Sequence, residues 1–232
     1  MADLHDATEH YLVQILELEE EGVVPLRARL VERLGLSAPT VSETVQRLID
    51  HGYVVMRAGH RLELTEAGAA IATSVVRRHR LAERLLLDVI GLEWDKVHRE
   101  ADRWEHVISP DVEARLVVLL DDPASCPHGN PIPGSAHAGR RVPAVALARA
   151  PTGPTAVARI NEKLELDDEG LHRVARLGLI PGATLEILAK SADGVRVRIG
   201  GSEHAVPAKL ADQLLVETPA RVSTGRSERV SA

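Results

Sequence analysis

The stretch LRARLVERLGLSAPTVSETVQRL, residues 26–48, predicts two short helices joined by a tight turn. Pro25 precedes the first helix and Gly35 ends it, since proline suits a first helical turn and glycine a left-handed cap. Ser37 is placed to cap the second helix, and Gly52 follows that helix. This pattern is typical of a helix-turn-helix.

The flanking residues extend this motif in both directions. Residues 8–22, TEHYLVQILELEEEG, carry apolar side chains at helical spacing and predict a preceding helix. Residues 53–65, YVVMRAGHRLELT, read as two strands that turn at Ala58-Gly59. Three helices followed by a hairpin predict a winged helix-turn-helix over residues 1–72.

The remainder predicts two further units. Helical periodicity or capping signals mark residues 65–91, 93–108 and 109–120, so we expect a helical domain over 73–140. The segment 121–141 is rich in proline and glycine and predicts a loop, with a linker over 141–150. Short alternating runs separated by Pro-Gly, Asp-Gly and Gly-Gly predict a small β-barrel over 151–218, before a disordered tail, 219–232. The fold class expected is mainly α with β.

Composition narrows the function classes. No apolar run approaches the roughly 20 residues of a membrane span, and the N-terminus lacks a signal-peptide pattern, so we expect a cytoplasmic protein with no membrane partner. One cysteine, Cys126, excludes a disulfide framework and a cysteine-rich zinc module. Any metal site must therefore depend on histidines and carboxylates.

Charge is segregated along the chain. The net charge of -6 argues against indiscriminate nucleic-acid binding. Residues 1–21 hold seven acids and no lysine or arginine, whereas residues 22–65 hold six arginines against four acids. The helix-turn-helix is thus the more basic part of its domain.

Residues 98–106, HREADRWEH, concentrate metal-ligand side chains on one helical stripe beside an apolar one. The members of that stripe are His98, Asp102, Glu105 and His106. His79 and Glu83 lie at i and i+4 on the preceding helix, a spacing that lets two side chains hold one ion. Either cluster alone is better explained by surface ion pairs, but both together on adjacent helices favour a metal site.

Alternatives of other classes remain open. Histidines and carboxylates could hold a catalytic metal, as in a hydrolase. We expect no enzyme, because the sequence contains no HExxH, G-x-S-x-G, P-loop or dinucleotide motif. A metal-independent regulator that senses a small molecule in the last domain is a third possibility, and chelation would leave its DNA binding intact.

The second helix of the helix-turn-helix carries the predicted DNA contacts. Ser37, Thr40 and Ser42 can donate to phosphates, and the Pro39 ring can contact thymine methyl groups. The predicted phosphate clamps are Arg27 and Arg47, with Arg57 as a further candidate, while Glu43 and Asp50 place acids near the DNA surface.

These residues resemble the diphtheria-toxin-repressor family of metal-dependent bacterial regulators. The likeness rests on EHYLVQILELEEEGVVPLRARLVERL, SAPTVSETVQRL, VVRRHRLAERLLLDVIGLEWDKVH, EADRWEHVIS and CPHGNPIPG, most of residues 3–134, and extends more loosely to the last domain. It implies a winged-helix DNA-binding domain, a helical dimerisation domain and an SH3-like third domain. It also implies a homodimeric repressor of metal homeostasis genes that binds palindromic operator DNA with divalent metal as corepressor.

The resemblance also implies two ions per subunit. The family's ancillary site matches His79, Glu83 and His98, completed by Glu162 and Glu165, and its primary site matches His10, Asp102, Glu105 and His106. Iron-responsive members have methionine at position 10 and cysteine at 102, whereas manganese-responsive members have carboxylates at both. Because oxygen and imidazole ligands form a harder site than sulfur, we expect Mn(II), with Fe(II) as the alternative.

Overall fold

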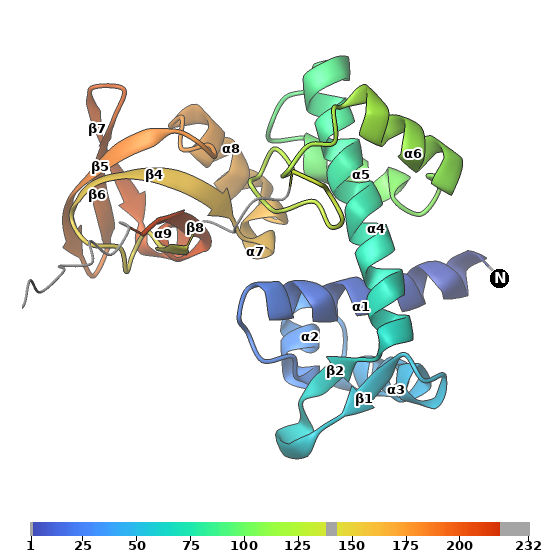
Figure 1. The fold of residues 1–232 in the computed structure, drawn as a ribbon. Helices are drawn as coiled ribbons and strands as arrows, with labels where there is room; N and C mark the ends of the chain where they lie inside the picture. Colours follow the sequence, from blue (N-terminus) through green and yellow to red (C-terminus); the bar gives the residue numbers. More distant parts are fainter. Residues whose placement is uncertain (1, 138–142, 219–232) are drawn as a thin grey trace, which may run out of the picture.

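The computed structural model describes residues 2–137 and 143–218. The predicted tail, 219–232, and the start of the predicted linker lie outside these residues. Figure 1 shows a helical module with a small hairpin, a long helix that rises from it, and a sheet-rich unit to one side. Within the described ranges, no helix is both long and apolar enough to cross a membrane.

The N-terminal module is the predicted winged helix. Its elements are α1 (Ala2–Glu20), α2 (Arg27–Leu34), α3 (Ala38–Asp50), β1 (Val54–Met56) and β2 (Leu62–Leu64). Ser37 Oγ accepts a hydrogen bond from the Thr40 backbone N–H at 3.3 Å, as predicted for the cap of α3. β1 and β2 pair antiparallel, and a core that includes Leu12, Leu30 and Val45 holds the module together.

The helical unit contains α4 (Glu66–Arg84), a π-helical turn (Leu85–Ile90), α5 (Val97–Trp104) and α6 (Pro110–Leu119). The predicted boundary at residue 72 falls inside α4, so one continuous helix joins the first two units. α5 ends at Trp104, which places Glu105 and His106 in the turn after the helix. The helical stripe that we predicted for 98–106 is therefore one helix plus a turn.

The third unit is an antiparallel sheet in the order β3-β8-β4-β5-β6-β7 with three helices. Its elements are β3 (Ala144–Ala146), β4 (Gly153–Ile160), α7 (Glu162–Glu165), α8 (Asp168–Arg176), β5 (Thr184–Ser191), β6 (Gly194–Ile199), β7 (Ser202–Pro207), α9 (Ala208–Gln213) and β8 (Leu214–Glu217). The prediction of a linker over 141–150 is wrong for β3, because Val145 pairs with Val216 of β8 and extends the sheet.

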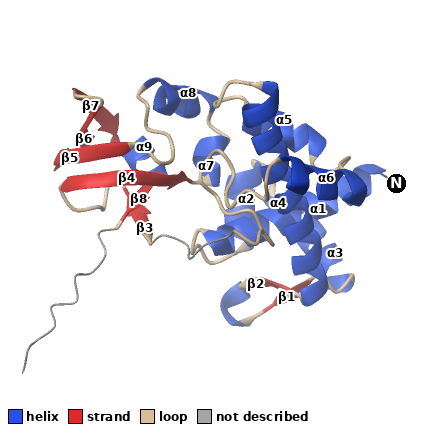
Figure 2. Cartoon of the chain, turned by 45° about the horizontal axis from the view of Figure 1, so that its top comes forward, coloured by secondary structure: helices blue, strands red, loops and turns tan. Residues whose placement is uncertain are grey.

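The three units meet at α7, which lies between the sheet and the helices in Figure 2. The Glu162 backbone N–H donates to Glu21 Oε1 of α1 at 3.2 Å. Buried Arg80 of α4 donates to Glu20 of α1 at 2.7 Å and to the Pro131 carbonyl at 2.6 Å. Polar contacts at the end of α1 thus connect all three units, to α7 through Glu21 and to the C-terminal part of α4 through Glu20.

Candidate metal centre and DNA-binding surface

A cavity of about 220 Å³ lies where α1, α4, α5 and α7 meet. It is lined by the predicted ligands His10, His79, His98, Asp102, Glu105, Glu162 and Glu165. The other two predicted ligands, Glu83 and His106, contact members of this lining. The fold therefore brings all nine predicted ligands to one place, although their role as ligands stays a prediction.

The first set of ligand atoms is fully enclosed. Glu83, His98, His128 and Glu165, called here the buried cluster, each offer one ligand atom within 4.8 Å of the others. Glu83 Oε1 lies 2.9 Å from His128 Nδ1 and 3.3 Å from His98 Nδ1. His98 Nδ1 in turn lies 3.1 Å from Glu165 Oε2. Ligand atoms from α4, α5, α7 and the loop after α6 therefore lie close together.

Opposite charges hold the buried cluster together. Burial favours the neutral form of Glu83, but the charges of His128 and His79 outweigh burial and hold its pKa well below the usual range. Burial also works against a charged His98, yet hydrogen bonds to Glu165 and Glu83 raise its pKa well above the usual value. Opposite charges thus offset part of the cost of burying these carboxylates and imidazoles together, and a metal must displace any proton that a ligating imidazole nitrogen holds.

The predicted primary ligands, His10, Asp102, Glu105 and His106, form what we call the outer group. Glu105 bridges two histidines, because its Oε2 lies 2.7 Å from His79 Nδ1 and its Oε1 lies 3.2 Å from His106 Nε2. Asp102 Oδ1 lies 3.4 Å from His79 Nδ1 and forms a three-residue ligand group with His79 and His98. Asp102, which the resemblance assigns to the primary site, thus lies beside two of the predicted ancillary ligands, His79 and His98.

Two contacts at the site were not predicted. His128 comes from a proline-rich loop that has no periodicity, so spacing could not place it beside Glu83, 45 residues away. Glu9 of α1 lies 2.7 Å from His106 Nδ1, across 97 residues of sequence. The only local signal for Glu9 was its position next to His10, and helical spacing points adjacent residues in different directions.

The predicted DNA-binding surface is the outer face of α3. Pro39, Thr40, Ser42, Glu43 and Arg47 are all exposed there.

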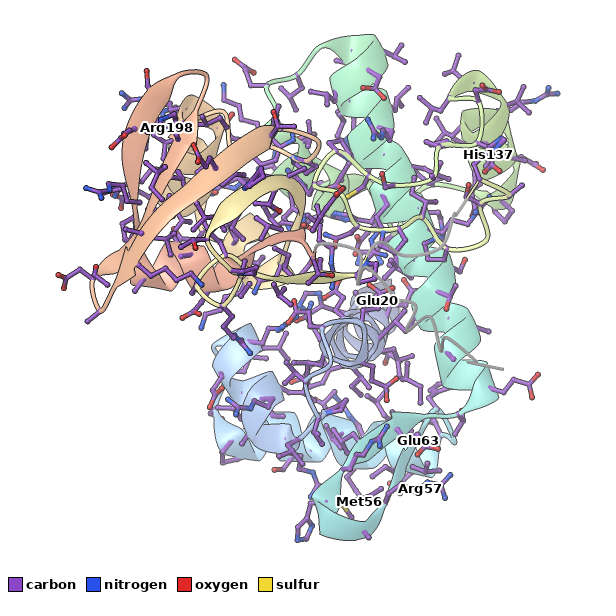
Figure 3. All side chains as sticks on the ribbon, turned by 60° about the vertical axis from the view of Figure 1, so that its left-hand side comes forward. Glu20, Met56, Arg57, Glu63, His137 and Arg198 are labelled. Carbon is purple, nitrogen blue, oxygen red and sulfur yellow. The ribbon has the colours of Figure 1, made fainter. Side chains whose placement is uncertain are left out.

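Several predicted DNA contacts already have partners. The Ser37 hydroxyl lies 2.8 Å from Thr40 Oγ1, and Arg47 donates to Thr44 at 3.1 Å. Arg27 is half-buried. In the wing, Arg57 pairs with Glu63 at 2.9 Å, side by side in Figure 3, so a phosphate would have to compete with this carboxylate.

Three family models match successive parts of the chain. Residues 3–59 match the iron-dependent repressor N-terminal DNA-binding domain, and residues 65–134 match the iron-dependent repressor metal-binding and dimerisation domain. Residues 145–218 match the FeoA domain. This match begins within β3, at residue 145, and agrees with the place of that strand in the sheet.

Two relatives and two solved structures also match most of the chain. The chain is 45% identical to the iron-dependent repressor IdeR of Mycobacterium tuberculosis, over 94% of this chain and 99% of the relative. It is 46% identical to the diphtheria toxin repressor of Corynebacterium diphtheriae, over 81% of this chain and 87% of the relative. A manganese-dependent transcriptional repressor in complex with manganese superimposes with a TM-score of 0.79 at 31% identity, over 91% of this chain and 100% of the other. T. acidophilum IdeR superimposes with a TM-score of 0.72 at 29% identity, covering 91% and 97% of the two chains.

These matches confirm the winged helix, the helical dimerisation domain and the SH3-like third domain. The chain therefore belongs to the iron-dependent repressor family and is a metal-dependent DNA-binding transcriptional repressor.

Proposed function

We propose that Mn(II) is the corepressor of this protein. The observation that carries the proposal is the donor set, since every predicted ligand offers nitrogen or oxygen and none offers sulfur. Burial and the charge of Glu83 raise the pKa of Cys126 well above its usual value, so that residue is a neutral thiol in the metal-free protein. Of the two methionines, Met56 lies on the wing (Figure 3) and Met1 lies outside the described residues.

The residues present suit a divalent cation. Glu83 is completely buried, and in the described part of the chain its Oε2 has no hydrogen-bond partner, although the Cys126 thiol interacts with this carboxylate. An unpaired buried carboxylate oxygen is costly, and a cation is the partner that such an atom accepts most readily. A bound ion would supply positive charge among the carboxylates. His10 would then join the DNA-reading module to Asp102, Glu105 and His106.

We further propose that the protein acts as a homodimer on a palindromic operator. α6 exposes Val112, Val118 and Leu119, an apolar face that a second copy can cover. Two recognition helices must lie about 34 Å apart to enter successive major grooves. Metal would favour the dimer geometry that meets this spacing, so metal affinity and operator affinity should rise together.

The test is operator binding at constant ionic strength, with Mn(II), Fe(II), Co(II) and Zn(II) each buffered at a known free concentration. We expect Mn(II) to support tight binding at the free concentration at which it fills the outer group. Operator binding that is unchanged by metal titration would contradict the corepressor mechanism. The genes expected under control are those for uptake or efflux of the sensed metal.

Fe(II) is the second candidate, because relatives that are 45% identical over nearly the full chain are named iron-dependent repressors. The double variant His10→Met with Asp102→Cys separates the two candidates. Thioether and thiolate ligands favour softer metals, so this variant should move activation toward Fe(II), Co(II) or Ni(II). An unchanged ranking of metals would mean that these two positions do not select the metal.

A further inference from the structure

We propose that Glu9 of α1 is a positioning residue that orients His106 for metal binding. The inference rests on the proposed function, because it assigns a role at the proposed outer site. It adds a second connection from the DNA-reading module to the ligands, beside the one that His10 provides.

The two ring nitrogens of His106 face different carboxylates. Nδ1 lies 2.7 Å from Glu9 Oε2, and Nε2 lies 3.2 Å from Glu105 Oε1. An ionised carboxylate only accepts hydrogen bonds, so the contact with Glu9 requires a proton on Nδ1. Nε2 also faces a carboxylate, Glu105, so any proton on Nε2 must leave when this nitrogen binds a metal. With Nδ1 held by Glu9, Nε2 is the nitrogen that can bind the ion.

This arrangement matches a general feature of metal sites. A histidine ligand usually donates its second N–H to a carboxylate or carbonyl, which fixes both the tautomer and the ring orientation. Glu9 can perform this role for His106 without touching the ion. Two neighbouring residues of α1 would then have different roles, since His10 lines the cavity and Glu9 orients His106.

The contact is better shielded than a surface ion pair. The Glu9 side chain is 13% exposed and that of His106 is 20% exposed. It also joins two units of the fold, because Glu9 belongs to α1 and His106 to the turn after α5. Any shift of α1 away from α5 would release His106 from its orientation, so the position of the DNA-reading module and metal affinity should depend on each other.

The experiment measures Mn(II) binding to the full-length metal-free protein and its Glu9→Ala and Glu9→Gln variants, from the electron paramagnetic resonance signal of free Mn(II). We expect Glu9→Ala to weaken one class of site by about 10- to 100-fold. Glu9→Gln should recover part of this loss, since its amide oxygen still accepts from Nδ1. Glu19→Ala is the matched control. It removes one negative charge from the same helix, and its partner is Arg61 of the hairpin, so it should bind Mn(II) within about twofold of wild type.

A second readout does not depend on metal identity. Nitrogen NMR of His106 in the metal-free protein should show protonated Nδ1 in wild type and loss of that preference in Glu9→Ala. Affinity equal to the Glu19→Ala control, or an unchanged His106 pattern, would overturn the proposal. The proposal would also fail if Glu9→Gln bound Mn(II) as weakly as Glu9→Ala and the spectrum of the bound metal showed one carboxylate ligand fewer than in wild type. That result would mean that Glu9 is itself a ligand. If Mn(II) fails to bind wild type, the manganese proposal fails, and the NMR result still decides the role of Glu9.

Discussion

The buried cluster and the outer group use the same residue types but differ in how far solvent reaches them, although Glu105 of the outer group is itself buried. Glu83 and His128 have no exposed side-chain surface, whereas the Asp102 side chain is 48% exposed. In the buried cluster, four segments enclose carboxylates and imidazoles that already neutralise one another. The outer group instead spans the contact between α1 and the end of α5. The difference suggests that the buried cluster mainly holds the domains together, while the outer group is where metal can change their arrangement.

The largest expected effect tests the stabilising role of the buried cluster. Glu83→Ala leaves His79, His98 and His128 without their shared carboxylate, and removing one partner of a buried ionic set costs about 3–5 kcal/mol. The free energy of unfolding of the metal-free protein, measured with urea, should fall by that amount. Glu100→Ala, a carboxylate on α5 outside the cluster, is the control. A loss below about 1 kcal/mol for Glu83→Ala would remove the contrast between the two sites.

Asp102 is expected to affect operator binding more than stability. Because this side chain is half exposed, Asp102→Ala should change the unfolding free energy by less than about 1 kcal/mol. At the Mn(II) concentration that saturates the wild-type protein, the operator affinity of Asp102→Ala should nevertheless be lower than that of wild type by about 5- to 150-fold, which is the usual range of an allosteric coupling. The measurement is fluorescence anisotropy with labelled operator. Equal operator affinity in both proteins would mean that the outer group does not control DNA binding.

His128 tests whether the buried cluster also binds metal. His128→Phe keeps an aromatic ring beside Trp94, whose ring centroid lies 4.6 Å away, but removes the nitrogen that faces Glu83. We expect Mn(II) affinity to fall about 10-fold at one class of site and to stay unchanged at the other. Titration of the metal-free protein with Mn(II) measures both affinities. Wild-type affinity at both classes would restrict His128 to packing and charge balance.

The smallest effect is expected at Glu17, an acid of α1 on the cavity wall. Burial and the nearby charge of Glu162 raise the pKa of Glu17 well above its usual value. The folded state therefore keeps this proton to a higher pH than the unfolded state does. Protonated Glu17 stabilises the fold near pH 4, and this contribution to the free energy of unfolding is lost as pH rises through the pKa of Glu17 in the folded state. Glu17→Gln cannot ionise and should be more stable than wild type at pH 8, by less than about 2 kcal/mol. Thermal unfolding from pH 4 to 8 should show this difference shrinking toward low pH, and a constant difference would contradict it.

Local signals predicted most elements because they depend on neighbouring residues. The Ser37 and Ser109 caps and the glycines after α1, α2 and α3 act within one turn, so spacing alone located them. The prediction failed at β3, which is too short to show alternation and exists because β8 pairs with it. It also extended α5 past Trp104, since periodicity continues in sequence after the backbone has left the helix.

By itself, the sequence determined the winged helix, the helical unit, the sheet-rich unit and the residue types that can bind metal. The family resemblance then indicated which of those residues belong together. Only the tertiary structure decided that Glu105 bridges His79 and His106, that Asp102 lies beside His79, and that His128 and Glu9 join the site. The reason is physical: caps and periodicity are set by contacts a few residues apart, whereas a ligand group is set by how separate helices and loops pack.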